Sequence, residues 1–137
     1  MKFEDSEYYK TLKHTKLEKP FGNFYFFETF LIAELNEGVH FDWEKIVDAM
    51  SDLINFYGEG VKLAYLSNRV NSYSMDPNSW EKIYKKYNVI IASAIVSYNN
   101  FTFMNASLEK GFSKKSIKRC LSLDEAIKWI FSLKEFS

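Results

Sequence analysis

The chain has 137 residues, of which 47% are hydrophobic and 26% are charged, a composition typical of one globular domain. Eighteen Lys and Arg residues balance eighteen Asp and Glu residues, which excludes the positive surface expected of a general nucleic-acid-binding protein. Aromatic residues form 18% of the chain. So many rings predict a large apolar core, an apolar pocket or a surface that a partner covers.

The first residues predict a peripheral segment. Residues 1–19 mix both charges without a clear period, so we expect an N-terminal arm or an edge strand over Thr15 to Glu18, followed by a single domain at 20–137. The first ten residues lack the apolar stretch of a secretory signal, and a single cysteine, Cys120, forms no intramolecular disulfide. Both features favour a cytoplasmic protein.

An aromatic strand and a helix follow this segment. Phe24 to Leu35 is a run of aromatic and branched residues that predicts one long strand, whose odd positions form a nearly apolar side. Asp42 is then placed to cap a helix that has apolar residues at helical spacing from Trp43 to Tyr57 and stops before Gly58.

The second half of the chain alternates strands and helices. Val61 to Leu66, Val89 to Val96 and Ser116 to Leu121 predict strands. Asp76-Pro77 opens a helix after the first of them, Phe101 to Lys110 predicts another, and Ser122 with Glu125 forms a capping box for the last. This order predicts an α/β fold with a mostly parallel sheet, an antiparallel N-terminal hairpin edge and about four helices.

No combination of residues predicts catalysis or metal binding. Glu37 and His40 have a spacing that metal-binding helices use, but a glycine between them predicts a turn. Glu28 and Glu34 on one strand would lie about 20 Å apart, against about 5–9.5 Å for the carboxylates of glycoside hydrolases. Cys120 has neither histidine near it in the sequence. We therefore expect no enzymatic activity, no metal and no cofactor.

Two polar loops provide the candidate binding site, because ligands and partners gather at the carboxyl ends of the strands in open parallel sheets. The predicted binding residues are Asn68, Arg69, Asn71, Ser72, Tyr73, Ser74, Tyr98 and Asn99. The alternative is that these side chains satisfy loop backbone and cap helices. Four rings near these strand ends would either line a pocket or close the core: Tyr73, Tyr98, Phe101 and Phe103.

Four segments between roughly residues 20 and 133 carry a family resemblance. They are Phe21-Gly-Asn-Phe-Tyr-Phe-Phe27, Glu34-Leu-Asn-Glu-Gly38, Leu66-Ser-Asn-Arg-Val-Asn-Ser-Tyr-Ser74 and Ser122-Leu-Asp-Glu-Ala-Ile-Lys-Trp129. With them the chain resembles STAS/Sec14-type domains and is similar to the SpoIIAA-like anti-sigma-factor antagonists of bacteria. The resemblance implies a compact domain that binds partners.

The leading expectation from this resemblance is a regulatory module that binds a protein, for instance an anti-sigma-factor-like protein. The alternative is binding of a lipid or a small apolar molecule, as in Sec14-like relatives. Antagonists of the family carry a phosphorylatable Ser, usually within Asp-Ser-Ser/Thr-Gly, and Ser72 or Ser74 occupies the comparable loop without that Asp or Gly. A homodimer through the Phe-rich N-terminal edge would be a further interaction, since unpaired strands invite pairing.

Overall fold

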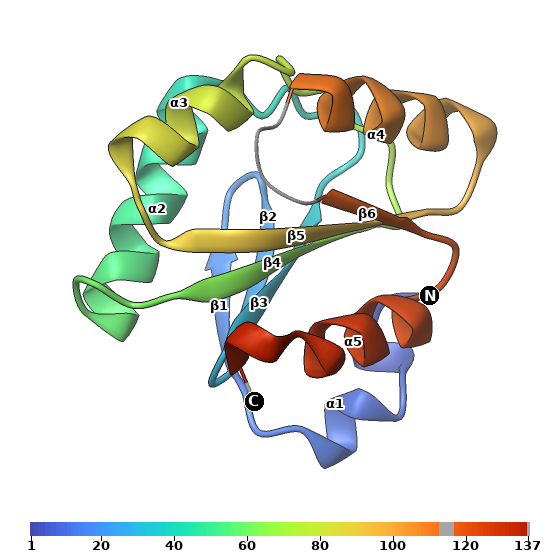
Figure 1. The fold of residues 1–137 in the computed structure, drawn as a ribbon. Coiled ribbons are helices and arrows are strands. Elements are labelled where there is room, and N and C mark those ends of the chain that lie inside the picture. The colour runs from blue at the N-terminus through green and yellow to red at the C-terminus, as the bar shows by residue number, and fades with distance from the viewer. Residues whose placement is uncertain (113–116, 137) are drawn as a thin grey trace.

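A computed structural model describes residues 1–112 and 117–136 of the chain. It contains one mixed sheet with helices on both faces (Figure 1). In chain order the elements are η1 (Phe3–Asp5), α1 (Tyr8–Thr11), β1 (Thr15–Lys19), β2 (Gly22–Phe26), β3 (Phe30–Leu35), α2 (Trp43–Tyr57), β4 (Leu63–Arg69), α3 (Ser79–Lys86), β5 (Ile90–Ser97), α4 (Asn100–Phe112), β6 (Ile117–Cys120), α5 (Leu123–Ser132) and η2 (Lys134–Phe136).

The strands lie in the sheet in the order of the sequence, from β1 to β6. The first three strands form an antiparallel meander, and β3 to β6 run parallel to one another. Each parallel pair is joined by a crossover that contains a helix, as parallel pairing requires. This arrangement confirms the predicted α/β class and its mostly parallel sheet.

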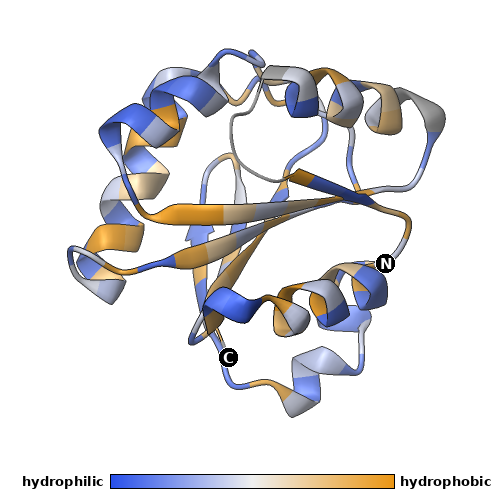
Figure 2. Cartoon of the chain, in the orientation of Figure 1, coloured by the Kyte–Doolittle hydropathy of each residue, from blue (hydrophilic) through white to orange (hydrophobic). Residues whose placement is uncertain are grey.

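Helices cover both faces of the sheet, α2, α3 and α4 on one face and α1 and α5 on the other (Figure 1). The core therefore has two layers. One packs Ile46 of α2, Trp80 of α3 and Ala106 of α4 against the sheet, and the other packs Phe3 and Ile127 of α5 against the opposite face. Hydrophobic residues accordingly gather on the strands and on the inner sides of the helices (Figure 2).

The aromatic run from residue 24 to residue 35 is a hairpin, so the prediction of one long strand was wrong. Phe27, Glu28 and Thr29 connect β2 to β3, and the Phe27 N–H donates to the Phe30 carbonyl across this connection. Tyr25 then packs on one face of the sheet while Leu31 packs on the other. The connection contains no Gly, Pro, Asn or Asp, the residues that normally signal a turn.

Strand β4 is longer than predicted and includes part of the expected loop. Asn68 and Arg69 pair with Val96 and Ser97 of β5 as the last residues of the ladder. Backbone pairing does not depend on side-chain polarity, provided that each buried polar side chain has a partner. The two residues therefore belong to the sheet, and because they are consecutive they face opposite sides of it.

The predicted helix boundaries hold closely where caps specify them. The Asp42 carboxylate accepts the Lys45 N–H at the start of α2, which ends at Tyr57, just before Gly58. The Ser122 hydroxyl accepts the Glu125 N–H at the start of α5. Helix α3 starts at Ser79, two residues after Pro77, because Asp76 first forms a turn with Asn78. Ser116, the first residue of the predicted last strand, lies outside the described residues.

The free edge formed by β1 is charged, whereas the Phe-rich β2 lies inside the sheet. Strand β1 consists of Thr15–Lys19 and pairs with β2 along one side. Lys19 forms ion pairs across to Asp48 and Asp52 of α2. Lysine-bearing edges resist pairing with another chain.

Candidate functional site

The eight predicted binding residues do not form one crevice. Asn68, Arg69 and Tyr73 are buried, Asn71 and Ser72 are half-buried, and Ser74, Tyr98 and Asn99 are exposed. They divide into three groups, which lie on the two faces of the sheet and in the outer loops.

Arg69 belongs to a buried cluster on the face of the sheet that carries α3 and α4. Its guanidinium binds the Glu109 carboxylate of α4 with two bonds, from Nη1 to Oε2 at 2.6 Å and from Nη2 to Oε1 at 2.7 Å. The Trp80 indole N–H donates to the same carboxylate at 2.9 Å, and Arg69 Nε donates to Ser67 Oγ at 3.0 Å. Both charges are enclosed, so Arg69 joins β4, α3 and α4 inside the domain.

Tyr73 completes this cluster. The Arg69 guanidinium lies 4.9 Å from the centre of the Tyr73 ring, and the Tyr73 and Ser67 hydroxyls are 2.7 Å apart. Burial raises the pKa of Tyr73, so its hydroxyl stays protonated. The alternative considered from the sequence was that these side chains satisfy loop backbone and cap helices. Arg69 and Tyr73 instead contact other side chains inside the domain.

Asn68 belongs to a second cluster on the opposite face, where the N-terminal residues cover the sheet. Its Nδ2 donates to Glu34 Oε2 at 2.6 Å and to the Met1 carbonyl at 2.9 Å. The Tyr98 hydroxyl donates to Asn68 Oδ1 at 2.7 Å, and the Phe3 N–H donates to Glu34 Oε2 at 2.7 Å. Residues 1–3 thus occupy the carboxyl ends of β3, β4 and β5 on this face.

Glu34 was not among the predicted site residues, although an acidic residue within an apolar strand is a sequence signal for a buried polar cluster. Its carboxylate is buried at the end of β3, and burial raises its pKa above the ordinary value of 4.5. Hydrogen bonds from Phe3 and Asn68 oppose this shift without cancelling it.

Glu34→Gln is expected to change how stability depends on pH. Because the folded chain holds the Glu34 proton more tightly than the unfolded chain, the parent loses stability as pH rises from 4.5 through the folded pKa. A glutamine Oε1 accepts the same two hydrogen bonds without this loss. The unfolding free energy of the variant, relative to the parent, should therefore rise across that window in urea titrations from about pH 4 to about pH 8. Two parallel curves would show that Glu34 has no raised pKa.

The remaining predicted residues satisfy loops or cap a helix. Asn71 Nδ2 donates to the Leu35 carbonyl at 3.0 Å, and the Ser72 N–H donates to Glu37 Oε2 at 2.7 Å. Ser74 Oγ lies 2.8 Å from His40 Nδ1. Asn99 Oδ1 accepts the Thr102 N–H at 2.9 Å at the start of α4.

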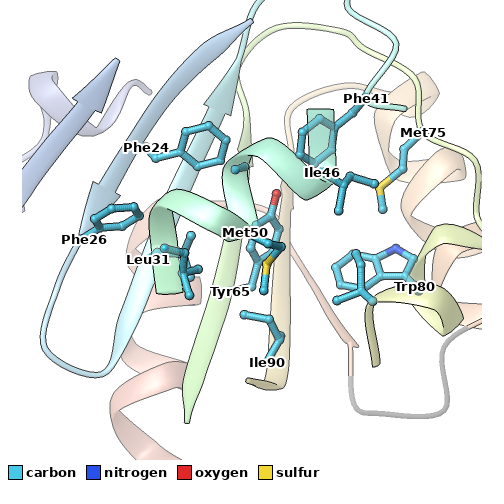
Figure 3. A pocket seen from close by; sticks show the side chains of 13 residues that line it. Phe24, Phe26, Leu31, Phe41, Ile46, Met50, Tyr65, Met75, Trp80 and Ile90 are labelled. Atoms are coloured by element: carbon cyan, nitrogen blue, oxygen red, sulfur yellow. The ribbon is translucent and has the colours of Figure 1, made fainter. Parts of the chain in front are cut away.

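The core contains an apolar cavity of about 40 Å³ between the sheet and helices α2 and α3 (Figure 3). Phe24, Leu31, Ile46, Met50 and Trp80 are among its lining residues, and the Tyr65 hydroxyl is also directed toward it (Figure 3). Ligand pockets usually measure about 300–1,000 Å³, so this cavity is a packing defect. Its apolar walls indicate that it is dry.

A larger cleft, of about 740 Å³, opens near the amino ends of the parallel strands, at the other end of the sheet from the Arg69 and Asn68 clusters. We call it the aromatic cleft. Its lining residues are Leu12, Lys13, His14, Thr15, Phe26, Phe27, Glu28, Thr29, Phe30, Phe56, Tyr57, Phe131 and Phe136. The sequence provided only a weak signal for it, because its Phe and Tyr rings come from three separate parts of the chain, residues 26–30, 56–57 and 131–136.

Of the four rings predicted near the carboxyl ends, the three with described side chains, Tyr73, Tyr98 and Phe103, line neither of these two cavities. Tyr73 is buried, Tyr98 is bonded to Asn68, and Phe103 lies beneath the Arg119 guanidinium at 4.7 Å. The side chain of Phe101 lies outside the part that the structure describes.

Among the described residues, no group of three or more His, Cys, Asp or Glu side chains is arranged to hold a metal ion. Cys120 is buried, and burial raises the pKa of its thiol to about 11, which disfavours the nucleophilic thiolate. No helix in the described ranges has both the length and the apolar character needed to cross a membrane.

Comparison with known proteins places the fold. An uncharacterized protein of the DUF3478 family from Shewanella loihica PV-4, whose crystal structure has a SpoIIAA-like fold, superposes with a TM-score of 0.54. The match covers 87% of this chain and 93% of that chain at 10% sequence identity. The fold is SpoIIAA-like.

This likeness confirms the resemblance to STAS-type domains at the level of fold. No protein-family model matches the sequence, and no curated protein matches it. The comparisons therefore establish the fold alone, and in this SpoIIAA-like sheet the Arg69 and Asn68 clusters fill the polar strand ends.

Proposed function

We propose that this chain is a non-enzymatic regulatory module of the STAS type that binds a partner protein beside the carboxyl ends of its parallel strands. The observation that supports this proposal is the exposure of Met104 and Leu108 on α4, at 67% and 58%. These residues are one helical turn apart, and Tyr98, also exposed, lies two residues before the helix begins. Apolar side chains surrounded by polar ones are typical of protein interfaces.

A binding role without catalysis agrees with the state of the polar residues in this region. Arg69 bonds Glu109 and lies against the Tyr73 ring inside the domain, and Phe3 covers Glu34. A catalytic group must reach its substrate. None of these four groups does so in this conformation, so the outer surface is left for recognition.

Ser74, rather than Ser72, is the phosphoacceptor that this proposal assigns to a phosphorylation switch. Ser74 is exposed, and its Oγ lies beside His40, whose imidazolium form would pair with a phosphate. The Ser72 N–H is bound by the Glu37 carboxylate, whose charge would repel a phosphate there. An anti-sigma-factor-like protein is the class of partner that the family resemblance suggests.

The double substitution Met104→Glu/Leu108→Glu should abolish partner binding without unfolding the domain, because both side chains are exposed and charges there prevent an apolar contact. Quantitative cross-linking mass spectrometry in cell extract measures which proteins bind the parent and each variant. Leu121→Glu is the matched control, since Leu121 is equally apolar, 72% exposed and outside α4. Equal recovery of every partner with the double variant and the control would assign binding to another surface.

Binding of a small apolar ligand is the second candidate function, and the observation that favours it is the aromatic cleft. Its volume lies within the range of small-molecule sites, and aromatic side chains form about half of its lining.

A further inference from the structure

We infer that the aromatic cleft binds a small organic cation, a quaternary or protonated amine attached to an apolar body. This inference rests on the second proposed function, apolar-ligand binding, and it identifies the ligand class that the cleft would select. Three independent features of the cleft support a positive charge on the ligand.

The first feature is the arrangement of aromatic rings. Phe27 and Phe30 are stacked with their centres 4.3 Å apart, and the Phe131 ring meets Phe30 edge-on at 5.7 Å. Phe56 packs on Phe26 at 4.9 Å and on Tyr57 at 4.8 Å. Phe56 and Phe131 remain 49% and 53% exposed. The faces of aromatic rings carry negative potential, and several rings around one space bind ammonium groups.

The second feature is the direction of two helices. Helix α2 ends at Tyr57, and α5 ends one residue after Phe131, so both C-termini lie at the cleft. The unpaired carbonyls of a helix C-terminus carry partial negative charge, which a basic side chain in the last turn usually offsets. Neither helix has a basic residue in its last turn, although Lys134 lies two residues after the end of α5. A bound cation would supply the positive charge that the end of α2 lacks.

The third feature is the acidic side chain of the lining. Glu28 is the exposed residue of the connection between β2 and β3 and, among the described residues, makes no hydrogen bond or ion pair. Lys13 and His14 are the basic residues of the lining. His14 bonds the Leu12 carbonyl oxygen through Nδ1 and packs against Phe27. Lys13 is exposed and opposes a cation, so its removal should strengthen cation binding.

Three fluorescent probes with one apolar body test the inference: diphenylhexatriene, its trimethylammonium derivative and its propionate derivative. Titration of the full chain, followed by fluorescence anisotropy, measures each affinity. We expect the trimethylammonium probe to bind about tenfold more tightly than the neutral probe, and the propionate probe to bind least tightly. Glu28→Gln should weaken only the trimethylammonium probe, by about threefold to tenfold, and Lys13→Gln should strengthen it by about threefold.

Phe131→Leu distinguishes the effect of the aromatic face of Phe131 from the effect of its apolar contact. Leucine keeps most of the apolar contact and removes the aromatic face, so this variant should lose affinity for the trimethylammonium probe and retain the neutral one. Phe131 is half exposed, and circular dichroism checks that the variant is folded. Leu121→Ala changes an exposed apolar residue that does not line the cleft, so it is the control and should bind all three probes as the parent does.

The outcomes distinguish the cation from the apolar ligand. Two results would overturn cation binding and leave the proposal of apolar-ligand binding in place. One is that the propionate probe binds as tightly as the trimethylammonium probe or more tightly, and the other is that Glu28→Gln leaves the affinity for the trimethylammonium probe unchanged. Binding of none of the three probes would overturn both. The combination of cation preference, Glu28 dependence and Phe131 dependence would support the inference.

Discussion

Arg69→Met should lower the free energy of unfolding by about 3–5 kcal/mol, because it leaves the Glu109 carboxylate buried without its ionic partner. Met replaces the aliphatic part of the arginine but none of its donors. Trp80 Nε1 then remains to bond a carboxylate that was held by three donors. Urea unfolding followed by tryptophan fluorescence measures the change.

The double variant Arg69→Met/Glu109→Leu tests the cause of this loss. With both charges removed, the interior no longer holds an unpaired ion, and we expect recovery of about 2 kcal/mol or more relative to Arg69→Met. The Trp80 N–H loses its acceptor in this variant, so recovery should be incomplete. Arg119→Met is the matched control: this strand arginine is only half-buried, and it bonds the Ser107 hydroxyl.

These variants also distinguish a structural role for Arg69 from a role in binding a partner. A structural arginine predicts a large loss of stability in the single variant and a smaller loss in the double variant. A binding arginine predicts nearly unchanged stability and weaker partner binding. A change below about 1 kcal/mol in Arg69→Met would contradict the structural role described for the cluster.

Phe3→Ala is expected to destabilise the domain by about 3–5 kcal/mol, although Phe3 lies in a segment that the sequence marks as peripheral. Its ring is fully buried beneath the sheet, with ring centres 4.7 Å from Tyr25 and 5.3 Å from Phe27. Truncation removes these contacts and leaves a cavity in the layer beneath α5. Thermal and urea unfolding measure the loss.

Two further variants give the control for Phe3. Phe3→Leu keeps most of the buried volume and should cost less than about 1.5 kcal/mol. Tyr9→Ala removes an exposed ring from the same segment and should cost about 1 kcal/mol or less. If Phe3→Ala is no more costly than Tyr9→Ala, residues 1–14 form a detachable arm, and the Glu34 carboxylate is open to solvent more often than the structure indicates.

The elements that the sequence predicted correctly depend on near neighbours in the chain. The Asp42 cap bonds a residue three positions away, and the capping box pairs Ser122 with Glu125. Helical crossovers between apolar runs specify parallel strands wherever they occur. The hairpin at Phe27 to Thr29 lacked such a local signal, so a continuous aromatic run was read as one strand.

The candidate site depended on contacts that sequence spacing does not reveal. The partner of Asn68 is Glu34, 34 residues earlier, and the partner of Arg69 is Glu109, 40 residues later. Polar residues after an apolar run predict a loop, and the sheet ladder places these two inside the domain. The same limit applies to the aromatic cleft, whose rings come from β2, β3, α2 and the end of the chain.

The sequence by itself therefore determined the α/β class, the mostly parallel sheet and the helices with strong caps, because hydrophobic period and capping act over a few residues. Only the tertiary structure decided which polar residues are internal partners and where the rings leave an open space. Burial and ion pairing are properties of surfaces that meet after folding. The structure likewise assigns places to the aromatic residues that form 18% of the chain: most of their rings pack in the two core layers, and a few line the aromatic cleft.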